Sequence, residues 1–194
     1  ITPTRLACLK NDRIILAIDD DYMAISSIQA NTYSRIILDM GLWPISMQFD
    51  HTQNRLFVAT YPRVGQKEFI PNWGKGLFIL SLDDSSITPL SIPNAQTIKF
   101  CYNIVTNTLY FINDDNHFIY NYDLDSKTES LILSNAEAYD LAIDYNTAKL
   151  YYSDETTKTI WHANWSGTNA LPLLQNHGFQ TLHFEYLSQD LRFG

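Results

Sequence analysis

Short runs of strand-forming residues alternate with polar turn residues along the whole chain. Between residues 139 and 174, the runs 139–143, 149–153, 159–163 and 170–174 are separated by segments rich in Asp, Asn, Thr, Ser and Gly. Runs of this length that contain many β-branched and aromatic residues, bounded by such turn residues, are typical of β-strands. The pattern therefore predicts four short antiparallel strands in this segment.

The same pattern recurs at a nearly fixed spacing. An acidic or amide residue stands six positions before a leucine at Asp50, Asn103, Asp144 and Glu185, so the intervals between these anchor residues are 53, 41 and 41 residues. The first interval exceeds the others by 12 residues, which indicates an insertion. A repeat of about 40 to 45 residues with four strands in each unit matches a β-propeller, whose blades stack because none buries its faces alone.

The fold class expected is therefore all-β, a β-propeller of four-stranded antiparallel blades in one domain that covers residues 1–194. Blades are expected at approximately 4–40, 44–93, 96–134 and 138–175, with a partial fifth blade at 179–194. Because the fifth repeat stops after its second strand, we expect the chain to be part of a larger propeller, a fragment or a nicked product. A second polypeptide would then complete the propeller.

Composition agrees with a folded domain, and it disfavours several classes of partner. Hydrophobic residues make up 45% of the chain and charged residues 18%, which is ordinary for a globular protein. The net charge of −8 and the pI near 4.9 argue against a nucleic-acid surface, because binding phosphate requires clustered Lys and Arg. Since no run of about 18 apolar residues exists, no membrane span is expected. A secreted or extracytoplasmic location is favoured, although no targeting signal decides the compartment.

The two cysteines, Cys8 and Cys101, occupy equivalent positions in non-adjacent repeats. A disulfide requires the two Cα atoms to lie within about 7 Å, and the first strands of blades two apart should be farther away than that. We therefore expect two unpaired, buried thiols.

One repeat carries a family resemblance. The segment Leu141-Ala-Ile-Asp-Tyr-Asn-Thr-Ala-Lys-Leu-Tyr-Tyr-Ser-Asp154, followed by Ile160 and by Ser166-Gly167, resembles the YWTD-type blades of low-density-lipoprotein-receptor-like propellers. In this resemblance the letters from Tyr151 to Asp154 stand for the Tyr-Trp-Thr-Asp signature. It is clearest in residues 139–174, and the neighbouring repeats carry Tyr-Phe-Ile-Asn and Phe-Val-Ala-Thr at the same place. Members of that family are commonly six-bladed and bind proteins, and the resemblance implies both properties here.

Blade topology places the predicted loops on two faces of the propeller. The connection between the second and third strands lies on the same side as the connection into the next blade, so one face gathers the acidic loops of three blades and the inserted loop of the second. Long loops on rigid scaffolds often carry binding residues, and aromatic residues with Arg are typical of interface hot spots. The candidate ligand-binding residues on this face are Tyr61, Arg63, Lys67, Phe69, Trp73, Asp20, Asp21, Asp114, Asp115 and Glu155.

A simpler interpretation is that Asp and Asn fill tight turns, for which they are the usual residues. Loop carboxylates from several blades could also form an oxygen cage for Ca²⁺, although no contiguous ligand motif is present, and no other cofactor is expected. The stretch Tyr139-Asp-Leu-Ala-Ile-Asp144 resembles the first strand of gluconolactonase-type and regucalcin-type propellers, which would imply a channel metal.

No sequence pattern indicates a catalytic nucleophile. The five histidines accompany no Gly-x-Ser-x-Gly elbow and include no His-x-x-x-His pair. The leading hypothesis is thus a non-enzymatic platform that binds a protein or peptide. The alternatives are a metal-dependent propeller hydrolase or lyase and a carbohydrate-binding propeller that stacks sugars on Trp and Tyr.

Overall fold

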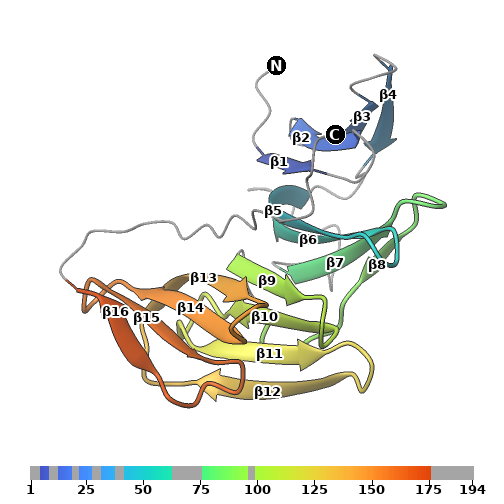
Figure 1. Ribbon diagram of the computed structural model, residues 1–194. Coiled ribbons are helices and arrows are strands. Elements are labelled where there is room, and N and C mark those ends of the chain that lie inside the picture. The colour runs from blue at the N-terminus through green and yellow to red at the C-terminus, as the bar shows by residue number, and fades with distance from the viewer. Residues whose placement is uncertain are drawn as a thin grey trace, which may run out of the picture.

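The computed structural model describes the backbone at residues 5–8, 13–18, 22–27, 32–37, 42–62, 76–95 and 99–175. It describes side chains at 46–60, 76–95 and 99–175. Every regular element within these ranges is a β-strand, which confirms the all-β prediction (Figure 1). Within the same ranges, no helix is long and apolar enough to cross a membrane.

Sixteen strands form four sheets of four, and we number these sheets as blades 1 to 4. Blade 1 consists of β1 (Arg5–Cys8), β2 (Arg13–Ile18), β3 (Tyr22–Ser27) and β4 (Thr32–Ile37). Blade 2 consists of β5 (Leu42–Asp50), β6 (Arg55–Pro62), β7 (Gly76–Ser81) and β8 (Ile87–Pro89). Blade 3 consists of β9 (Lys99–Asn103), β10 (Thr108–Ile112), β11 (Ile119–Asp123) and β12 (Thr128–Leu133). Blade 4 consists of β13 (Ala138–Asp144), β14 (Lys149–Asp154), β15 (Thr159–Asn164) and β16 (Leu171–Leu174).

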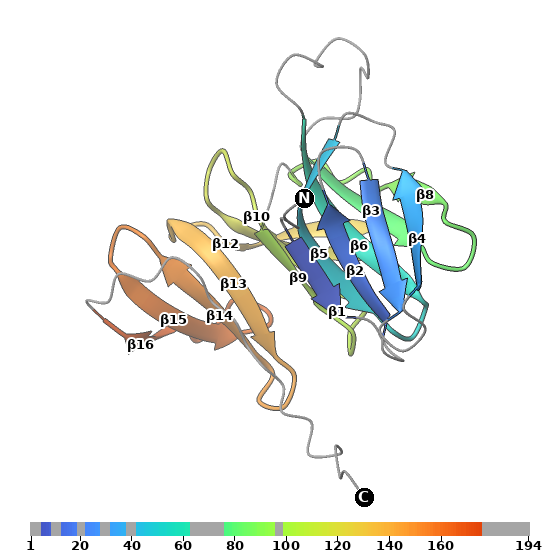
Figure 2. The same ribbon diagram turned by 90° about the horizontal axis from the view of Figure 1, so that it is seen from above.

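The strands of each blade follow one another in chain order, and every neighbouring pair is antiparallel. The first strands of successive blades contact one another, from β1 to β5, from β5 to β9 and from β9 to β13. Seen from above, the four blades form an arc with these first strands side by side in the middle (Figure 2). This is the blade arrangement of a β-propeller, as the repeat predicts.

The described hydrophobic core lies between the blades, because blades 2 and 3 present apolar side chains on both faces. The first cluster joins blade 3 to blade 4 and contains Cys101, Tyr110, Ile112, Ile119, Leu133, Leu141, Ile143, Leu150, Tyr152 and Ala163. The second joins blade 2 to blade 3 and contains Phe57, Ala59, Leu77, Phe100, Tyr102, Leu109, Phe111, Tyr120 and Tyr122. Alternate residues of β10 therefore belong to different clusters, as the twofold alternation of a strand requires.

The free thiol of Cys101 lies within the first of these clusters. Burial, with a smaller effect from the negative charge of Asp140, raises the pKa of this thiol well above its ordinary value. The side chain of Cys8 lies outside the described residues, so only one of the two predicted buried thiols is seen.

The anchor residues of the repeat initiate the turns between strands. Asp50, Asn103 and Asp144 each accept, at Oδ1, a hydrogen bond from the backbone N–H two residues later, at 3.0, 3.0 and 2.9 Å. Four residues after each anchor, the chain enters the left-handed region, with φ of 46° at Asn54, 50° at Asn107 and 54° at Ala148. Each turn thus consists of an Asx turn followed by one left-handed residue, and this requirement explains the repeated Asp and Asn.

Candidate functional site

The candidate site lies on the side of the blades that carries the β2–β3, β6–β7, β10–β11 and β14–β15 connections, which we call the insert face. The insertion detected in the second repeat falls in the β6–β7 connection. The connections that lead from one blade to the next lie on the same side, because each blade has an even number of antiparallel strands. The insert face therefore combines loops from every blade.

Backbone hydrogen bonds join the loops of blades 3 and 4 on this face. The N–H of Ala138 donates to the carbonyl oxygen of His117 at 3.2 Å, and the N–H of Glu155 donates to that of Glu137 at 3.1 Å. The β12–β13 connection thus bonds to the β14–β15 loop through Glu137, and the first residue of β13, Ala138, bonds to the β10–β11 loop. Three loops from two blades form one connected edge, which we call the loop rim, spanning residues 113–117, 134–137 and 154–158.

Two polar side chains hold the loop rim in shape. Asn113 is buried, and its Oδ1 accepts hydrogen bonds from the N–H groups of Asp115 and Asn116 at 2.9 and 3.1 Å. Its Nδ2 donates to the carbonyl oxygen of Asn94 at 2.8 Å, which attaches the connection from blade 2. In the next blade Asp154 is also buried, and its Oδ1 accepts from the N–H of Thr157 at 2.8 Å. These groups therefore serve the turns, as the simpler sequence interpretation proposes.

The carboxylates that remain accessible on the rim stand beside these turn-forming residues. Asp115, Glu137 and Glu155 are exposed, whereas Asp114 is half-buried. The structure thus separates buried turn formers from exposed acidic side chains that can meet a ligand. The sequence analysis treated both kinds of residue together as acidic loops. It overlooked Glu137, which lies in the connection between blades 3 and 4 rather than in a turn within one blade.

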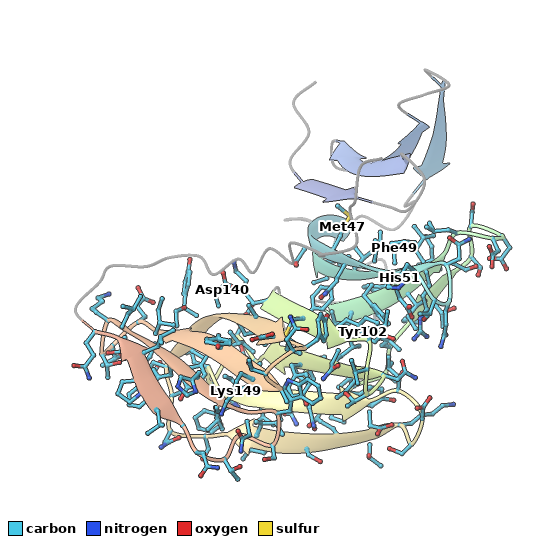
Figure 3. All side chains as sticks on the ribbon, in the orientation of Figure 1. Met47, Phe49, His51, Tyr102, Asp140 and Lys149 are labelled. Carbon is cyan, nitrogen blue, oxygen red and sulfur yellow. The ribbon has the colours of Figure 1, made fainter. Side chains whose placement is uncertain are left out.

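Three further residues lie where the first strands of blades 3 and 4 begin on the insert face. The Nζ atom of Lys99 lies 3.6 Å from Oδ2 of Asp140 and 5.8 Å from the centroid of the Tyr139 ring. Tyr139 is 41% exposed, so its ring offers an accessible aromatic surface near the middle of the blade arc. Figure 3 shows Asp140 at this end of blade 4. The candidate site residues predicted from the sequence include none of these three. Their common position, four or five residues before an anchor, could have indicated that they lie together.

The other predicted site residues lie outside what the structure describes. This applies to Asp20 and Asp21 in the β2–β3 connection and to residues 63–75 of the insertion, which contain Arg63, Lys67, Phe69 and Trp73. The backbone of Tyr61 belongs to β6, but its side chain is not described. Among the ten predicted positions, the structure therefore brings together Asp114, Asp115 and Glu155 on the loop rim.

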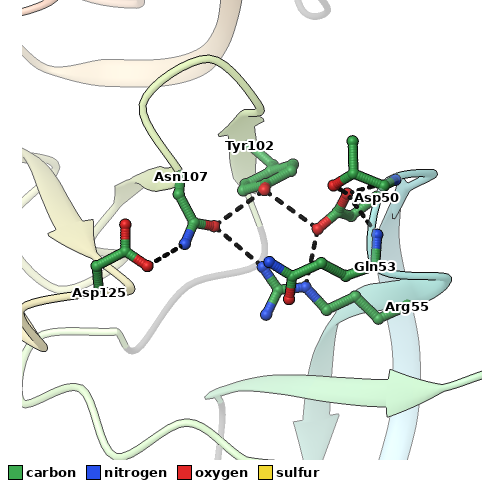
Figure 4. A network of polar contacts seen from close by, with 7 residues as sticks. Asp50, Gln53, Arg55, Tyr102, Asn107 and Asp125 are labelled. Carbon is green, nitrogen blue, oxygen red and sulfur yellow. Dashed lines mark hydrogen bonds and ion pairs between the residues drawn. The ribbon is translucent and has the colours of Figure 1, made fainter.

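A separate polar network lies between blades 2 and 3 on the opposite side (Figure 4). Nε of Arg55 donates to Oδ2 of the fully buried Asp50 at 2.9 Å, and a terminal guanidinium nitrogen donates to Oδ1 of Asn107 at 3.0 Å. The single proton of the Tyr102 hydroxyl lies within reach of the same two acceptors, at 3.1 and 3.0 Å. Asn107 in turn donates to Asp125 at 2.6 Å. We call this network the interblade clamp, and the burial of Asp50 and Tyr102 indicates a structural role.

The clamp shifts the pKa of its ionisable members. Burial is the largest effect on Asp50 and acts to raise its pKa, but hydrogen bonds from Thr52 and Arg55 together outweigh it, so the pKa lies below the ordinary value of 3.8. Burial also raises the pKa of the Tyr102 hydroxyl, and the neighbouring Asp50 carboxylate raises it further. Asp50 is thus held ionised and Tyr102 protonated, which suits an acceptor and a donor.

In the part of the chain that the structure describes, no group of three His, Cys, Asp or Glu side chains is arranged to hold a metal ion. The described carboxylates of the insert face are spread along the loop rim and the start of β13.

Comparisons with known proteins show similarity in the fold. No family model and no curated protein match this chain. Among solved structures, an auxiliary nutrient binding protein from Bacteroides thetaiotaomicron has 12% identity and a TM-score of 0.66, covering 91% of this chain and 43% of that chain. A chain of a nidogen/laminin complex has 14% identity and a TM-score of 0.68, covering 89% of this chain and 64% of that chain.

A structural genomics protein of unknown function from Bacteroides thetaiotaomicron also matches, with 11% identity and a TM-score of 0.61 over 86% of this chain and 42% of that chain. The chain thus spans less than two thirds of the length of each of these three solved chains. Identities of 11 to 14% show a shared fold alone.

Proposed function

We propose that this protein is a non-enzymatic binding platform that recognises a protein or peptide ligand through its insert face. The observation that carries the proposal is the loop rim, in which backbone hydrogen bonds join loops of two blades into one edge. Loops fixed in this way lose little conformational freedom when a ligand binds, and such preorganisation favours affinity.

The charge of the described rim suggests the chemistry of the ligand. Asp115, Glu137 and Glu155 are exposed there, and Lys158 is the exposed cation beside them. A ligand that presents Lys or Arg toward the rim would gain electrostatic complementarity, which raises the association rate most at low salt. The insertion adds Arg63, and with Trp73 it supplies the residue types common at interface hot spots.

Two of the similar solved structures concern binding. One is an auxiliary nutrient binding protein and the other is a nidogen/laminin complex. These similarities support a binding role for this chain without naming its ligand. We further propose that the blades are of the YWTD type, that they belong to a six-bladed ring and that the protein acts outside the cytoplasm.

The proposal is tested with a library of displayed random peptides selected against the whole immobilised protein. Selected peptides are then measured against three variants, Arg63→Glu, Trp73→Ala and the pair Glu137→Lys with Glu155→Lys. We expect each variant to weaken binding at least tenfold, because each removes a contact or reverses a charge on the insert face. The matched control is Lys127→Glu, an exposed charge reversal in the β11–β12 turn on the opposite side.

Peptides that bind all four variants with equal affinity would rule out the insert face as the site. A selection that yields only peptides sensitive to Lys127→Glu would move the site to the opposite side. Melting curves for every variant show whether a loss of binding reflects a loss of folding.

A further inference from the structure

The turn between β15 and β16 carries a short modification signal that the proposed function does not use. Asn164-Trp165-Ser166 has the pattern Asn-x-Ser, with x other than Pro, which is the acceptor sequence for N-linked glycosylation. No other asparagine in the sequence has Ser or Thr two positions later. Because so short a pattern also arises by chance, its place in the fold must show whether this asparagine suits the reaction.

The pattern lies in a closed turn at the surface. Asn164 ends β15, and its N–H donates to the carbonyl oxygen of Thr168 at 2.9 Å. The N–H of Gly167 donates to the carbonyl oxygen of Asn164 at 2.8 Å. Ser166 and Thr168 are exposed, and Asn164 is half-buried. The acceptor sequence thus occupies a surface turn, which is the context that N-linked glycosylation requires.

The other two residues of the turn hold it against the core. Trp165 is half-buried and packs against the cluster between blades 3 and 4. Gly167 has a φ of 79°, and a Cβ atom at this position would collide with the carbonyl oxygen of Ile132 on β12. The turn therefore lies directly against blade 3. Its bulky residue belongs to the core, whereas Asn164 and Ser166 keep exposed surface.

Two contacts orient the side-chain amide of Asn164. Nζ of Lys149 donates to Oδ1 at 2.9 Å, and Nδ2 donates to Oγ1 of Thr168 at 3.3 Å. An ammonium group can only donate, so the contact with Lys149 assigns the amide oxygen to that side and the nitrogen to the side of the exposed Thr168. Nδ2 is the atom that would carry the sugar, and it lies on the exposed side of the amide.

We propose that Asn164 is an acceptor of N-linked glycosylation, an inference that rests on the proposed location outside the cytoplasm. An oligosaccharyltransferase joins Nδ2 to C1 of the first sugar of a lipid-pyrophosphate-linked oligosaccharide. The new C1–N bond replaces the C1–O bond to pyrophosphate, the lipid pyrophosphate leaves, and Nδ2 gives up one of its two protons. The product keeps Oδ1 and one N–H, so the contacts with Lys149 and Thr168 are both compatible with the modification.

The position of the turn suits a bulky glycan. Because β15 starts at the β14–β15 connection on the insert face, its end at Asn164 lies on the opposite side, away from the loop rim. The next strand, β16, exposes Leu171, Leu173 and Leu174 at 56%, 52% and 44%. An edge strand with exposed apolar side chains favours association with other chains. A hydrated glycan beside this strand would hinder such association and leave the insert face open.

The test expresses the full chain behind a cleavable signal peptide in mammalian cells. The mass of the protein from medium and from cell lysate is read before and after digestion with peptide N-glycosidase in water labelled with oxygen-18. This digestion releases the glycan and leaves a labelled aspartate at the modified position. We expect most molecules to carry a glycan, and we expect the label at residue 164.

Three variants separate the acceptor sequence from general exposure. Asn164→Gln removes the acceptor nitrogen from its position and Ser166→Ala removes the required hydroxyl, so each should abolish the glycan. The matched control is Asn146→Gln, at an exposed asparagine in the β13–β14 turn on the same side, which Ala148 follows two positions later. This control should keep the glycan.

An unmodified wild-type mass in both fractions, or a glycan that persists in Asn164→Gln, would overturn the proposal. Because the signal peptide imposes the location, either result would remove the acceptor alone and leave the proposed binding function standing. Peptide binding to the insert face, measured on the same protein, reports on that function separately.

Discussion

At the residue scale, the repeat is explained by the backbone that each turn requires. Six hairpin turns share an Asp or Asn at the first position and a left-handed residue four positions later. At that second position the chain uses Asn54 and Asn107, but also Ala148, Lys127, Lys158 and His117. A residue with a Cβ pays roughly 1–2 kcal/mol in the left-handed conformation, and Asn tolerates it best after glycine. The anchors therefore report turn geometry rather than a ligand.

Replacing Ala148 by Asn should stabilise the protein. Ala148 is exposed at φ 54°, so the change adds no buried group and relieves part of the left-handed strain. We expect a gain of about 1 kcal/mol and a rise in melting temperature of about 2–4 °C. Calorimetry of the two proteins measures this gain. Ser134→Asn, at an exposed position with ordinary φ, should change the melting temperature by less than 1 °C on the same surface-substitution argument, and an equal rise there would contradict the argument.

Sequence alone predicted the turns well and the chemistry at their ends less well. The spacing from anchor to leucine located the strands, because a leucine at +6 is buried in each of blades 2 to 4, at Leu56, Leu109 and Leu150. It did not distinguish Asp154, whose carboxylate is buried and bonds to an amide of its own turn, from Glu155, which is exposed. Both are acidic residues of one loop. That distinction depends on which side chain faces the turn amides, and only the three-dimensional arrangement supplies it.

At the element scale, the interblade clamp joins blades 2 and 3 through hydrogen bonds from one buried ion pair of blade 2 to Tyr102 and Asn107 of blade 3. Asp50 is fully buried, and the Arg55 side chain is 14% exposed. The corresponding residues at the next interface are Asn103, Thr108 and Ile143, and Nδ2 of the buried Asn103 has no hydrogen-bond acceptor there. The two interfaces thus resemble each other in their apolar clusters but differ in their polar contacts. The clamp was therefore not predictable from the repeat.

Breaking the clamp from one side should be costly. Arg55→Met leaves Asp50 buried without its cation, and we expect a loss of about 3–5 kcal/mol in the free energy of unfolding. Tyr102→Phe keeps the ion pair and should cost only about 1 kcal/mol. Urea titration at pH 7 measures both losses. If Arg55→Met cost no more than Tyr102→Phe, Arg55 would not be the main support of the clamp.

Acid should weaken the clamp through Asp50. Its pKa is lowered in the folded protein, so its contribution is fully present above the unfolded value near 3.8 and is lost as the pH falls through the folded value. Asp50→Asn has no charge to lose, so the stability difference between wild type and this variant should shrink as the pH is lowered from 5 to about 2.5. Urea midpoints across this range measure the difference, and a constant difference would show that Asp50 does not titrate in the clamp.

At the scale of the whole molecule, the described blades form a row of interfaces rather than one central core. Blade 2 contributes residues to two of the described clusters, and so does blade 3, so stability resembles a sum of neighbour terms. The residues that stabilise the fold are thus separate from the proposed binding residues, because the hydrophobic clusters lie between the blades and the loop rim lies at the ends of the strands. Substitution of rim residues such as Glu155 should therefore change binding without disturbing the core.

This arrangement predicts that blade 3 is the most protected of the described blades. All five residues of β10 are buried, from Thr108 to Ile112, whereas Lys149 and Tyr151 of β14 are only half-buried. Opening β10 must break two clusters, so its amides should exchange more slowly than those of β15 and β16, by at least tenfold. Native-state hydrogen exchange read by mass spectrometry measures this order.

Phe111→Ala should then accelerate exchange in blades 2 and 3 more than in blade 4, because Phe111 belongs to the cluster with blade 2. Uniform exchange across all the described blades, unchanged in its order by Phe111→Ala, would show instead that the propeller opens as one cooperative unit.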